Sequence, residues 1–539
     1  MSRARVGATL AAVVPLFVLA ACGQPASSVG ANSGGRHTHH GPMLVGAAGG
    51  TVTVALDQVP TTLNDHTVAG DTPNTRLIAS AIWPQVFQVG PGQTPMPDTA
   101  VVQSAELVSV NPQTVVYTID PRATWSDGVP ISATDFVYAW QSQRGGTDDT
   151  DGTPDSVAST LGYRDIVSVT PGNGGRTVTV VFRSPFGDWD SLFDDLLPAH
   201  IAERVGWNKG FDEFGSSVTV SGGPWVVESW QPGVRLVLGR NPHWWGPAPH
   251  LDRIVFVAAQ NGSALLDDLR SGESQVGYPS AFGSSLLAAL TSSPELETAE
   301  SLGTNMMELV FNTKDAPFDN VDVRQGIAHS IDRAGIVTNL VQPVDPSVWE
   351  DNNHLFANVQ PQYDDDAASY VHADPVAASR SLEQGGLVAD PNGTWISHGT
   401  PVTIQLAWAY DDPWSDLVEP AIASQLTAAG FDVSLEPVTS SQLSGSVLPS
   451  GSYDLALVPF SASAYPSATA AYYSSAPNLT NPGTNLDWSG FSDPKLDTLF
   501  TNASEQLGPN LADPMYQQVD EELWAQMPTL PLFAEPTLL

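Results

Sequence analysis

Residues 125–136 read Trp-Ser-Asp-Gly-Val-Pro-Ile-Ser-Ala-Thr-Asp-Phe, and no other short stretch says more about the architecture. Its first half predicts a tight turn, because Gly128 tolerates positive φ and Asp127 can hydrogen-bond its own backbone. Ser132 then precedes an apolar helical pattern, and Asp135 follows three residues later. This spacing approximates a capping box. The stretch therefore predicts a turn that leads directly into a capped helix.

Three further segments accompany it along the chain. They are Gly223-Pro-Trp-Val-Val-Glu-Ser-Trp-Gln-Pro-Gly233 with Arg240-Asn-Pro-His-Trp-Trp-Gly246, Phe311-Asn-Thr-Lys-Asp-Ala-Pro-Phe-Asp319 with Val323–Arg333, and Tyr516-Gln-Gln-Val-Asp520 with Leu530-Pro-Leu-Phe533. In this order, the four segments resemble the extracellular solute-binding proteins of peptide and nickel ABC importers, called family 5. Turn residues, aromatic pairs and Arg–carboxylate pairs dominate them, so we interpret them as holding the fold rather than contacting ligand.

The resemblance implies an α/β fold of the periplasmic-binding-protein type II kind. Two lobes would close over a ligand in the cleft between them, and a third domain would be inserted. Lobe I would comprise residues 51–75, 218–301 and 513–539. The inserted domain II would comprise residues 76–217, and lobe II (domain III) residues 302–512.

Hydrophobic patterning supports a mixed α/β class independently of the resemblance. β-Branched and apolar runs predict strands at residues 51–56, 114–119, 177–182, 234–238, 254–257, 306–311 and 455–458. Capping and stop signals predict helices after Ser132, over residues 374–385 and over residues 515–527. Residues 402–435 predict a strand, a helix and a second strand in a βαβ-like unit.

The amino-terminal residues predict export. Arg3 and Arg5 precede a short apolar run that ends in Leu19-Ala20-Ala21-Cys22, which resembles a bacterial lipobox. The resemblance implies that the signal peptide, residues 1–21, is cleaved and that Cys22 is acylated, which leaves residues 22–50 as a flexible stalk. An incidental or buried cysteine is the alternative. The stalk tract His37-Thr38-His39-His40 is not expected to be a physiological metal site, because nothing nearby fixes a fourth ligand.

Composition excludes several classes of function. The formal net charge of −38 repels nucleic acid, so a role in tracking phosphates is excluded. The sequence contains no Gly-x-Ser-x-Gly, Ser-x-x-Lys, His-Glu-x-x-His or Walker A pattern, and it predicts no cofactor. We therefore predict that the chain is not an enzyme, with a secreted hydrolase as the third-ranked class.

The candidate ligand-binding residues follow from one position at which this sequence differs from the family pattern and from the clustering of aromatic residues. In peptide-binding members of the family, an aspartate binds the peptide α-ammonium, and Ala464 occupies the matching position in Ser463-Ala-Tyr-Pro-Ser-Ala468. Aromatic planes near strand ends suit sugars, apolar side chains or acyl chains. We expect His354 to be a surface residue rather than a ligand, in a polar loop that borders the cleft in relatives. The candidate set is Trp408, Tyr410, Trp414, Tyr465, Ala464, Asn305, Met306, Trp349 and His354.

These observations predict a monomeric, lipid-anchored solute-binding protein at the outer face of the cytoplasmic membrane. It would capture a peptide or another small solute and deliver it to an ABC permease and its ATPase. The alternative is a cell-envelope role, because the Arg-rich, Lys-poor usage and the divergent cleft resemble actinobacterial lipoproteins of the LpqW type. That resemblance implies a link to mannosylated phosphatidylinositol lipids rather than import.

Overall fold

The computed structural model describes residues 49–538, apart from residues 149, 151, 280–282, 368 and 476–485. The predicted signal peptide, Cys22, the stalk up to residue 48 and its histidines lie outside the described residues and stay predictions. Within the described residues, no helix is both long enough and apolar enough to cross a bilayer.

The first sheet forms around β1 (Thr51–Leu56), at the bounds that the β-branched run predicts. Its strand order is β11-β1-β10-β9-β8. The other strands are β8 (Trp225–Gln231), β9 (Arg235–Arg240), β10 (Arg253–Ala258) and β11 (Val276–Tyr278). β1 runs parallel to β10 and β11, whereas β9 runs antiparallel to β10 and β8. Two helices follow, α5 (Gly262–Ser271) and α6 (Ser284–Thr291).

A second group of elements surrounds a four-stranded antiparallel sheet of order β4-β5-β7-β6. The elements are α1 (Pro73–Ile82), β2 (Phe87–Gly90), β3 (Thr94–Pro97), β4 (Val102–Val110), β5 (Gln113–Ile119), α2 (Ala133–Gln143), β6 (Ile166–Gly172), β7 (Thr177–Phe182), α3 (Ala199–Val205) and α4 (Ser216–Thr219). The predicted capping box at α2 is confirmed. The Ser132 side chain accepts a hydrogen bond from the backbone of the first helical turn, and the Asp135 side chain accepts one from the backbone N–H of Ser132.

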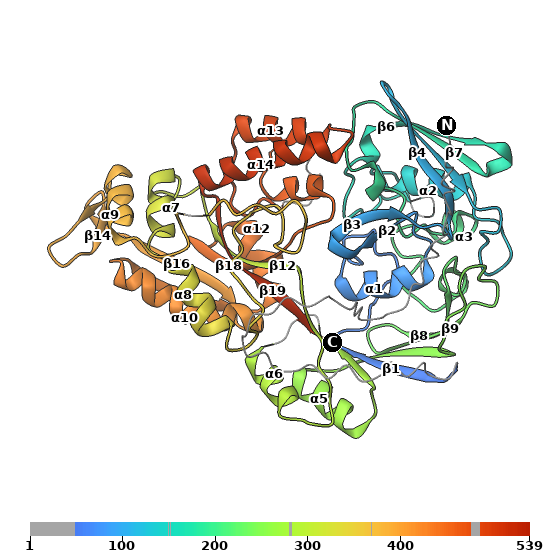
Figure 1. Ribbon diagram of the computed structural model, residues 1–539, viewed down its shortest axis with the longest axis horizontal. Coiled ribbons are helices and arrows are strands. Elements are labelled where there is room, and N and C mark those ends of the chain that lie inside the picture. Colours follow the sequence, from blue (N-terminus) through green and yellow to red (C-terminus); the bar gives the residue numbers. More distant parts are fainter. Residues whose placement is uncertain are drawn as a thin grey trace, which may run out of the picture. The chain divides into compact units, whose positions relative to one another are not determined.

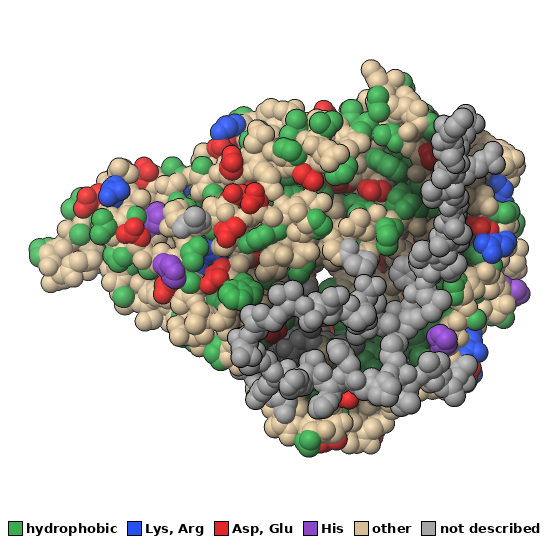
Figure 2. Space-filling view, in the orientation of Figure 1, with side chains coloured by type: hydrophobic (Ala, Val, Ile, Leu, Met, Phe, Trp, Pro, Cys, Tyr) green, Lys and Arg blue, Asp and Glu red, His purple; other side chains and the backbone are tan. Residues whose placement is uncertain are grey.

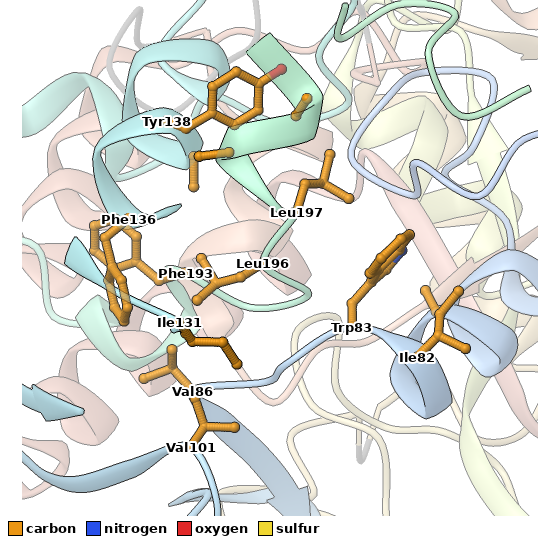
Figure 3. Close-up of a cluster of buried hydrophobic side chains, with 14 of the residues drawn as sticks. Ile82, Trp83, Val86, Val101, Ile131, Phe136, Tyr138, Phe193, Leu196 and Leu197 are labelled. Atoms are coloured by element: carbon orange, nitrogen blue, oxygen red, sulfur yellow. The ribbon is translucent and has the colours of Figure 1, made fainter. Parts of the chain in front are cut away.

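These elements share one hydrophobic core with the first sheet. Figure 3 shows its center, where Ile82 and Trp83 lie on one side and Phe136 and Phe193 on the other, with Ile131 between them. Trp83 is 1% exposed, and its ring packs edge-to-face against Phe211. Because the aromatic rings interlock with aliphatic side chains from several elements, this core fixes the loops that leave β5 and β7.

The other large sheet has the order β17-β16-β18-β12-β19, and we call it the second sheet. Its strands are β12 (Glu300–Phe311), β16 (Thr403–Ala409), β17 (Asp432–Val438), β18 (Leu455–Ser461) and β19 (Thr529–Leu538). The helix α10 (Pro413–Ala428) joins β16 to the parallel β17, so the predicted βαβ unit is confirmed. In Figure 1, α10 lies on one side of this sheet, and α13 (Pro494–Ser504) and α14 (Pro509–Gln526) lie on the other.

Shorter elements complete this part of the chain. They are α7 (Val321–Ala328), α8 (Arg333–Ile336), α9 (Pro375–Gln384), β13 (Val388–Ala389), β14 (Trp395–Ser397), β15 (Thr400–Pro401), α11 (Ser440–Gln442), α12 (Leu448–Ser450) and the 3-10 helix η7 (Pro466–Tyr472). Helix α9 starts at the predicted cap, where Asp374 accepts the amides of Val376 and Ala377. Acidic side chains outnumber basic ones on the face seen in Figure 2, as the net charge of −38 requires.

The prediction assigned residues 513–539 to lobe I, and the structure shows with which sheet the last strand of this segment pairs. Strand β19 pairs with β12 of the second sheet, with Thr529 opposite Val310 and Ala534 opposite Met306. Leu530, Leu532 and Phe533 are at most 1% exposed. Pairing with this buried apolar strand satisfies the backbone hydrogen-bonding groups along one edge of β12. Strand β19 therefore belongs with the second sheet at least as far as Ala534. The remaining predicted domain boundaries stay a proposal.

Candidate functional site

The carboxyl ends of β16, β17 and β18 lie at one edge of the second sheet, because β16 runs parallel to both of its neighbours. The antiparallel β12 brings Asn305 to the same edge. There, Ser461 Oγ donates a hydrogen bond to Asn305 Oδ1 at 2.7 Å. In open α/β sheets, ligands bind outside the carboxyl ends of the strands. The sheet geometry therefore favours this edge as the place where a ligand binds.

Four of the predicted site residues lie at this edge: Asn305, Tyr410, Ala464 and Tyr465. Tyr410 directly follows β16 and is 53% exposed, and its backbone N–H donates to Val438 O at 2.9 Å. Ala464 and Tyr465 follow β18 and are half-buried. Trp349 is 60% exposed in its loop. Contact between these residues and a ligand stays a proposal.

Three other predicted residues are core residues in this structure. Trp408 is 6% exposed, Trp414 1% and Met306 0%. Helices and loops cover both faces of the second sheet, so β16 is buried from Leu406 to Ala409. Trp414 packs edge-on against Phe533 at 6.0 Å between ring centroids. The aromatic clustering near the strand end reflected packing at these positions, and their side chains are not open to a ligand.

The expected surface position of His354 is wrong, since its side chain is completely buried. Asp520 of α14 accounts for this. The His354 backbone N–H donates to Asp520 Oδ1 at 2.7 Å, and His354 Nδ1 lies 2.9 Å from the same oxygen. Asn353 Nδ2 donates to the other carboxylate oxygen at 3.0 Å. Polar residues that satisfy one another in this way can be buried, and spacing along the sequence does not reveal such a pairing.

Two segments that are distant in sequence meet beyond the edge of the second sheet. One is Asp188-Trp-Asp-Ser-Leu-Phe-Asp-Asp195, which follows β7 and which we call the acidic segment. The other follows β18. The backbone N–H and Oγ of Ser467 donate to Asp188 Oδ2 at 2.8 and 2.5 Å, and Tyr465 Oη donates to the carbonyl of Asp190 at 3.1 Å. These contacts join the elements around β7 to the second sheet.

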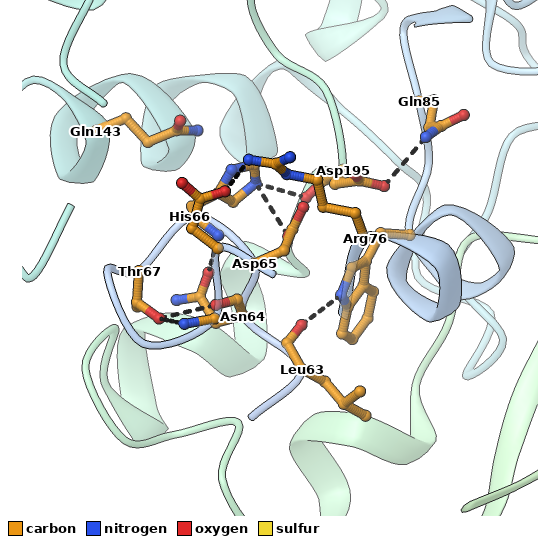
Figure 4. Close-up of polar contacts among 12 residues, drawn as sticks. Leu63, Asn64, Asp65, His66, Thr67, Arg76, Gln85, Gln143 and Asp195 are labelled. Carbon is orange, nitrogen blue, oxygen red and sulfur yellow. Dashed lines mark hydrogen bonds and ion pairs between the residues drawn. The ribbon is translucent and has the colours of Figure 1, made fainter. Parts of the chain in front are cut away.

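Asp65 adds a further carboxylate to the acidic segment. It lies beside Asp195 and His66 in Figure 4, with His66 Nε2 3.0 Å from the carbonyl of Asp195 and 3.9 Å from Asp65 Oδ1. Gln85 Nε2 approaches Asp195 Oδ1 at 3.5 Å. We call Asp65, Asp190, Asp194 and Asp195 the carboxylate cluster. It presents several acids close to the ring of Tyr465.

The surroundings of the carboxylate cluster disfavour the ionised form of its carboxyl groups. Burial raises the pKa of Asp194 to about 7, and the nearby charge of Asp65 adds to the effect. Burial and the charge of Asp188 raise the pKa of Asp190 to about 7. Burial also raises the pKa of Asp195 well above its ordinary value, with Asp65 and Asp194 contributing. Like charges in a partly dehydrated site disfavour the ionised form of each carboxyl group.

Basic side chains do not balance these acids within the described part of the chain. No arginine or lysine there forms an ion pair with a member of the cluster. Arg76 lies close by in Figure 4 but pairs with Asp71. Asp65 Oδ1 and Asp194 Oδ1 have no hydrogen-bond partner, and neither does the hydroxyl of Tyr117, a residue that is 0% exposed. Unpaired buried polar atoms of this kind call for a partner.

Sequence reasoning missed the acidic segment. The signal was present, because four aspartates fall within eight residues among Trp189, Leu192 and Phe193. Charged residues interleaved with large apolar ones indicate a segment that is partly buried despite its charge. Only the structure shows that this segment meets Tyr465.

A smaller polar site lies beneath the second sheet. Tyr473 Oη donates to both carboxylate oxygens of Glu308, at 3.0 and 3.2 Å. Burial raises the pKa of Glu308 to about 7. Glu308 borders a cavity of about 10 Å³ with Phe460, Tyr472 and Trp488. This volume suits about one water molecule rather than a solute.

The described residues contain no cluster of three or more His, Cys, Asp and Glu side chains arranged for a metal ion. The carboxylate cluster therefore differs from a metal centre, in which several ligands converge on one point. The chemistry that the site offers is hydrogen-bond acceptance and negative charge beside an aromatic ring.

Comparisons with known proteins agree with this architecture. The family model "Bacterial extracellular solute-binding proteins, family 5 Middle" matches residues 97–481. The probable monoacyl phosphatidylinositol tetramannoside-binding protein LpqW of Mycobacterium tuberculosis is 28% identical over 426 residues, which are 72% of this chain and 65% of LpqW. The oligopeptide-binding protein OppA of the same organism is 27% identical over 495 residues, which are 90% of this chain and 80% of OppA.

Solved structures extend the likeness across the fold. The periplasmic EDTA-binding protein EppA superposes with a TM-score of 0.82 at 27% identity, covering 91% of this chain and 92% of EppA. The oligopeptide-binding protein AppA of Bacillus subtilis, solved with a nonapeptide, gives a TM-score of 0.73 at 17% identity, covering 91% and 94%. The second likeness shows the fold alone. The predicted α/β architecture of the periplasmic-binding-protein type II kind is confirmed.

Proposed function

Because this chain belongs to family 5 of the bacterial extracellular solute-binding proteins, we propose that it captures a peptide or another small solute and delivers it to an ABC importer. Its relatives are solute-binding proteins rather than enzymes. The proposed event is binding alone. The solute contacts both lobes and favours the closed state, and it is released with its covalent bonds unchanged.

One observation carries the proposal. The contacts of Ser467 with Asp188 and of Tyr465 with Asp190 join the two sides of the structure where the strand ends of the second sheet favour a ligand. Each hydrogen bond contributes about 0.5–1.5 kcal/mol, and the one to an ionised carboxylate somewhat more. Contacts of this strength favour the closed form but leave it in equilibrium with the open form. A solute that binds the closed form better then shifts the population further.

The proposed solute contacts are Asn305, Tyr410, Ala464 and Tyr465. Their position at the carboxyl edge supports them, whereas the buried Trp408, Trp414, Met306 and His354 do not belong to the set. Ala464 supplies only a methyl group, so simple recognition of a free amino terminus at that position is not expected.

The proposal includes a lipid anchor at Cys22, a place at the outer face of the cytoplasmic membrane, a monomeric state, and permease and ATPase partners. The lipobox-like tetrad supports the anchor. Family membership supports the partners.

A second function has specific support. LpqW is similar over 72% of this chain, and the peptide-binding aspartate is replaced by Ala464. The alternative is a cell-envelope protein that binds a mannosylated phosphatidylinositol lipid rather than an imported solute.

A closure measurement tests the leading proposal. Fluorescent labels at Val108→Cys and Val388→Cys, positions that are 55% and 66% exposed, report the separation of the two sides in a Cys22→Ser background. We expect a mixture of tripeptides to shorten the label distance and to be recovered intact. The proposal fails if the peptides saturate the chain without changing the distance, or if they are cleaved. Selective closure by a phosphatidylinositol mannoside favours the alternative.

A further inference from the structure

The carboxylate cluster and Tyr465 approach each other from two sides of the structure, where Tyr465 Oη donates to the carbonyl of Asp190 at 3.1 Å. Burial raises the pKa of the Tyr465 hydroxyl, and the charges of Asp190, Asp194 and Asp188 add to the effect. Asp190 and Asp194 are half-buried residues, although Asp194 Oδ1 itself is shielded from solvent. A solute held between the two sides would meet carboxylates from the acidic segment and an aromatic ring from the segment after β18.

Unpaired polar atoms near these residues are the second observation. Asp65 is 7% exposed, and its Oδ1 has no hydrogen-bond partner, with His66 Nε2 at 3.9 Å. Tyr117 is completely buried, its hydroxyl has no partner, and it lies close enough to Asp190 and Tyr465 for their charges to act on it. Carboxylates accept hydrogen bonds, and a phenol oxygen can accept one as well. A donor would satisfy these atoms, and a donor with positive charge would also offset the like charges of the carboxylates.

We infer that Asp190 and Asp194 bind the positively charged end of the solute, an ammonium or guanidinium group, against the ring of Tyr465. This assignment rests on the proposed function and specifies its substrate class. An ammonium offers three donors to the carboxylates, and its charge also interacts favourably with an aromatic ring. Each charged hydrogen bond in a partly dehydrated site is stronger than a neutral one.

The assignment explains the substitution at position 464. Ala464 adjoins Tyr465 and carries no charge, so the second sheet supplies no anion at this point. The acidic segment supplies it from the opposite side. Within the described residues no arginine or lysine forms an ion pair with the cluster, and the nearby Arg76 is paired with Asp71. A divalent metal ion fits less well, because no cluster of three metal-binding side chains forms there.

Calorimetry with paired probes tests the assignment. The probes are a mixture of tripeptides with free amino ends and the same mixture after acetylation, added to the full chain carrying Cys22→Ser. We expect the free mixture to bind about 10- to 100-fold more tightly than the acetylated one. The double variant Asp190→Asn/Asp194→Asn should lose that preference. The charge-matched control is Asp267→Asn/Asp268→Asn, which removes two aspartates of α5 instead and should retain the preference.

Proton release supplies a readout that a merely structural role would not change. At pH 7, Asp190 and Asp194 each hold a proton part of the time, because burial raises both pKa values to about 7. A bound cation favours the ionised carboxylates, so binding should release up to about one proton. Calorimetry in two buffers of different ionisation enthalpy measures this release, and the double variant should abolish it.

The outcomes separate the two proposals. Equal binding of both mixtures, or unchanged preference and proton release in the double variant, overturns the charge assignment and leaves solute binding intact. Binding of neither mixture nor of the diamine cadaverine overturns the charge assignment and the capture of peptides. Binding of calcium or magnesium ions in place of the amines overturns the assignment in favour of a metal site. The variant's melting temperature should not fall, because asparagine replaces an acid that burial already disfavours in its charged form.

Discussion

The structure contains two buried groups of ionisable side chains that differ in charge balance. In one group, His354 pairs with Asp520, both are 0% exposed, and Asn353 donates to the other oxygen of the Asp520 carboxylate. In the carboxylate cluster, no arginine or lysine of the described residues pairs with the acids. We infer that Asp520, whose carboxylate has buried partners, holds the fold, whereas the acids of the carboxylate cluster mark where a cation binds.

The largest expected effect on stability comes from a substitution in the paired group. Asp520→Ala removes the acceptor of the His354 backbone, the His354 ring and Asn353. Leaving buried donors without a partner should lower the free energy of unfolding by about 3–5 kcal/mol. Urea unfolding measures this loss. Asp194→Asn serves as the contrast and should cost less than about 0.5 kcal/mol, and the reverse order of the two effects contradicts the comparison.

A second effect separates packing from binding along one strand. Trp408→Ala should lower the free energy of unfolding by about 3–5 kcal/mol, because Trp408 lies in the core. Tyr410→Ala, two residues later and 53% exposed, should change it by at most about 0.5 kcal/mol. Thermal unfolding of both variants measures the difference. Equal melting temperatures would show that Trp408 is not a core residue.

A third effect depends on pH at Glu308. Its pKa is about 7 in the folded chain and ordinary when unfolded, so the folded state keeps a proton that the unfolded state loses as pH rises above about 4.5. The folded state is therefore disfavoured progressively up to about pH 7, by roughly 3 kcal/mol at most. Glu308→Gln should remove this slope. Denaturant unfolding at pH 5 and pH 7.5 measures it, and parallel pH profiles for variant and wild type would contradict the assignment.

The smallest effect concerns the contact between the two sides. Ser467→Ala removes the hydroxyl that donates to Asp188 at 2.5 Å, which should cost about 1 kcal/mol of closure, or roughly fivefold in the closed population. Ser461→Ala removes a hydroxyl that bonds within the second sheet and is the matched control. The label-distance measurement reports both variants. A larger shift in the control would show that Ser467 does not contribute to closure.

Local signals in the sequence predicted local structure well. The capping box at Ser132 and Asp135 and the β-branched run at β1 were confirmed because neighbouring residues alone set them. The four segments predicted the family.

Long-range partners explain what sequence could not predict. Asp520 lies 166 residues from His354, and its carboxylate is what permits the burial of that histidine. β19 joins β12 through backbone pairing, which leaves no motif in the side chains. The acidic segment meets Ser467 279 residues away. Charge and hydrophobicity along the chain do not specify such pairings, so the candidate site became visible only in the fold.

The most direct test of the account identifies the solute that the purified full chain retains, by mass spectrometry after denaturation. We predict one intact small molecule per chain, carrying an amino or guanidino group, that the Asp190→Asn/Asp194→Asn variant does not retain. An uncharged or anionic solute retained equally by both proteins, or the cleaved products of a larger one, would contradict the account.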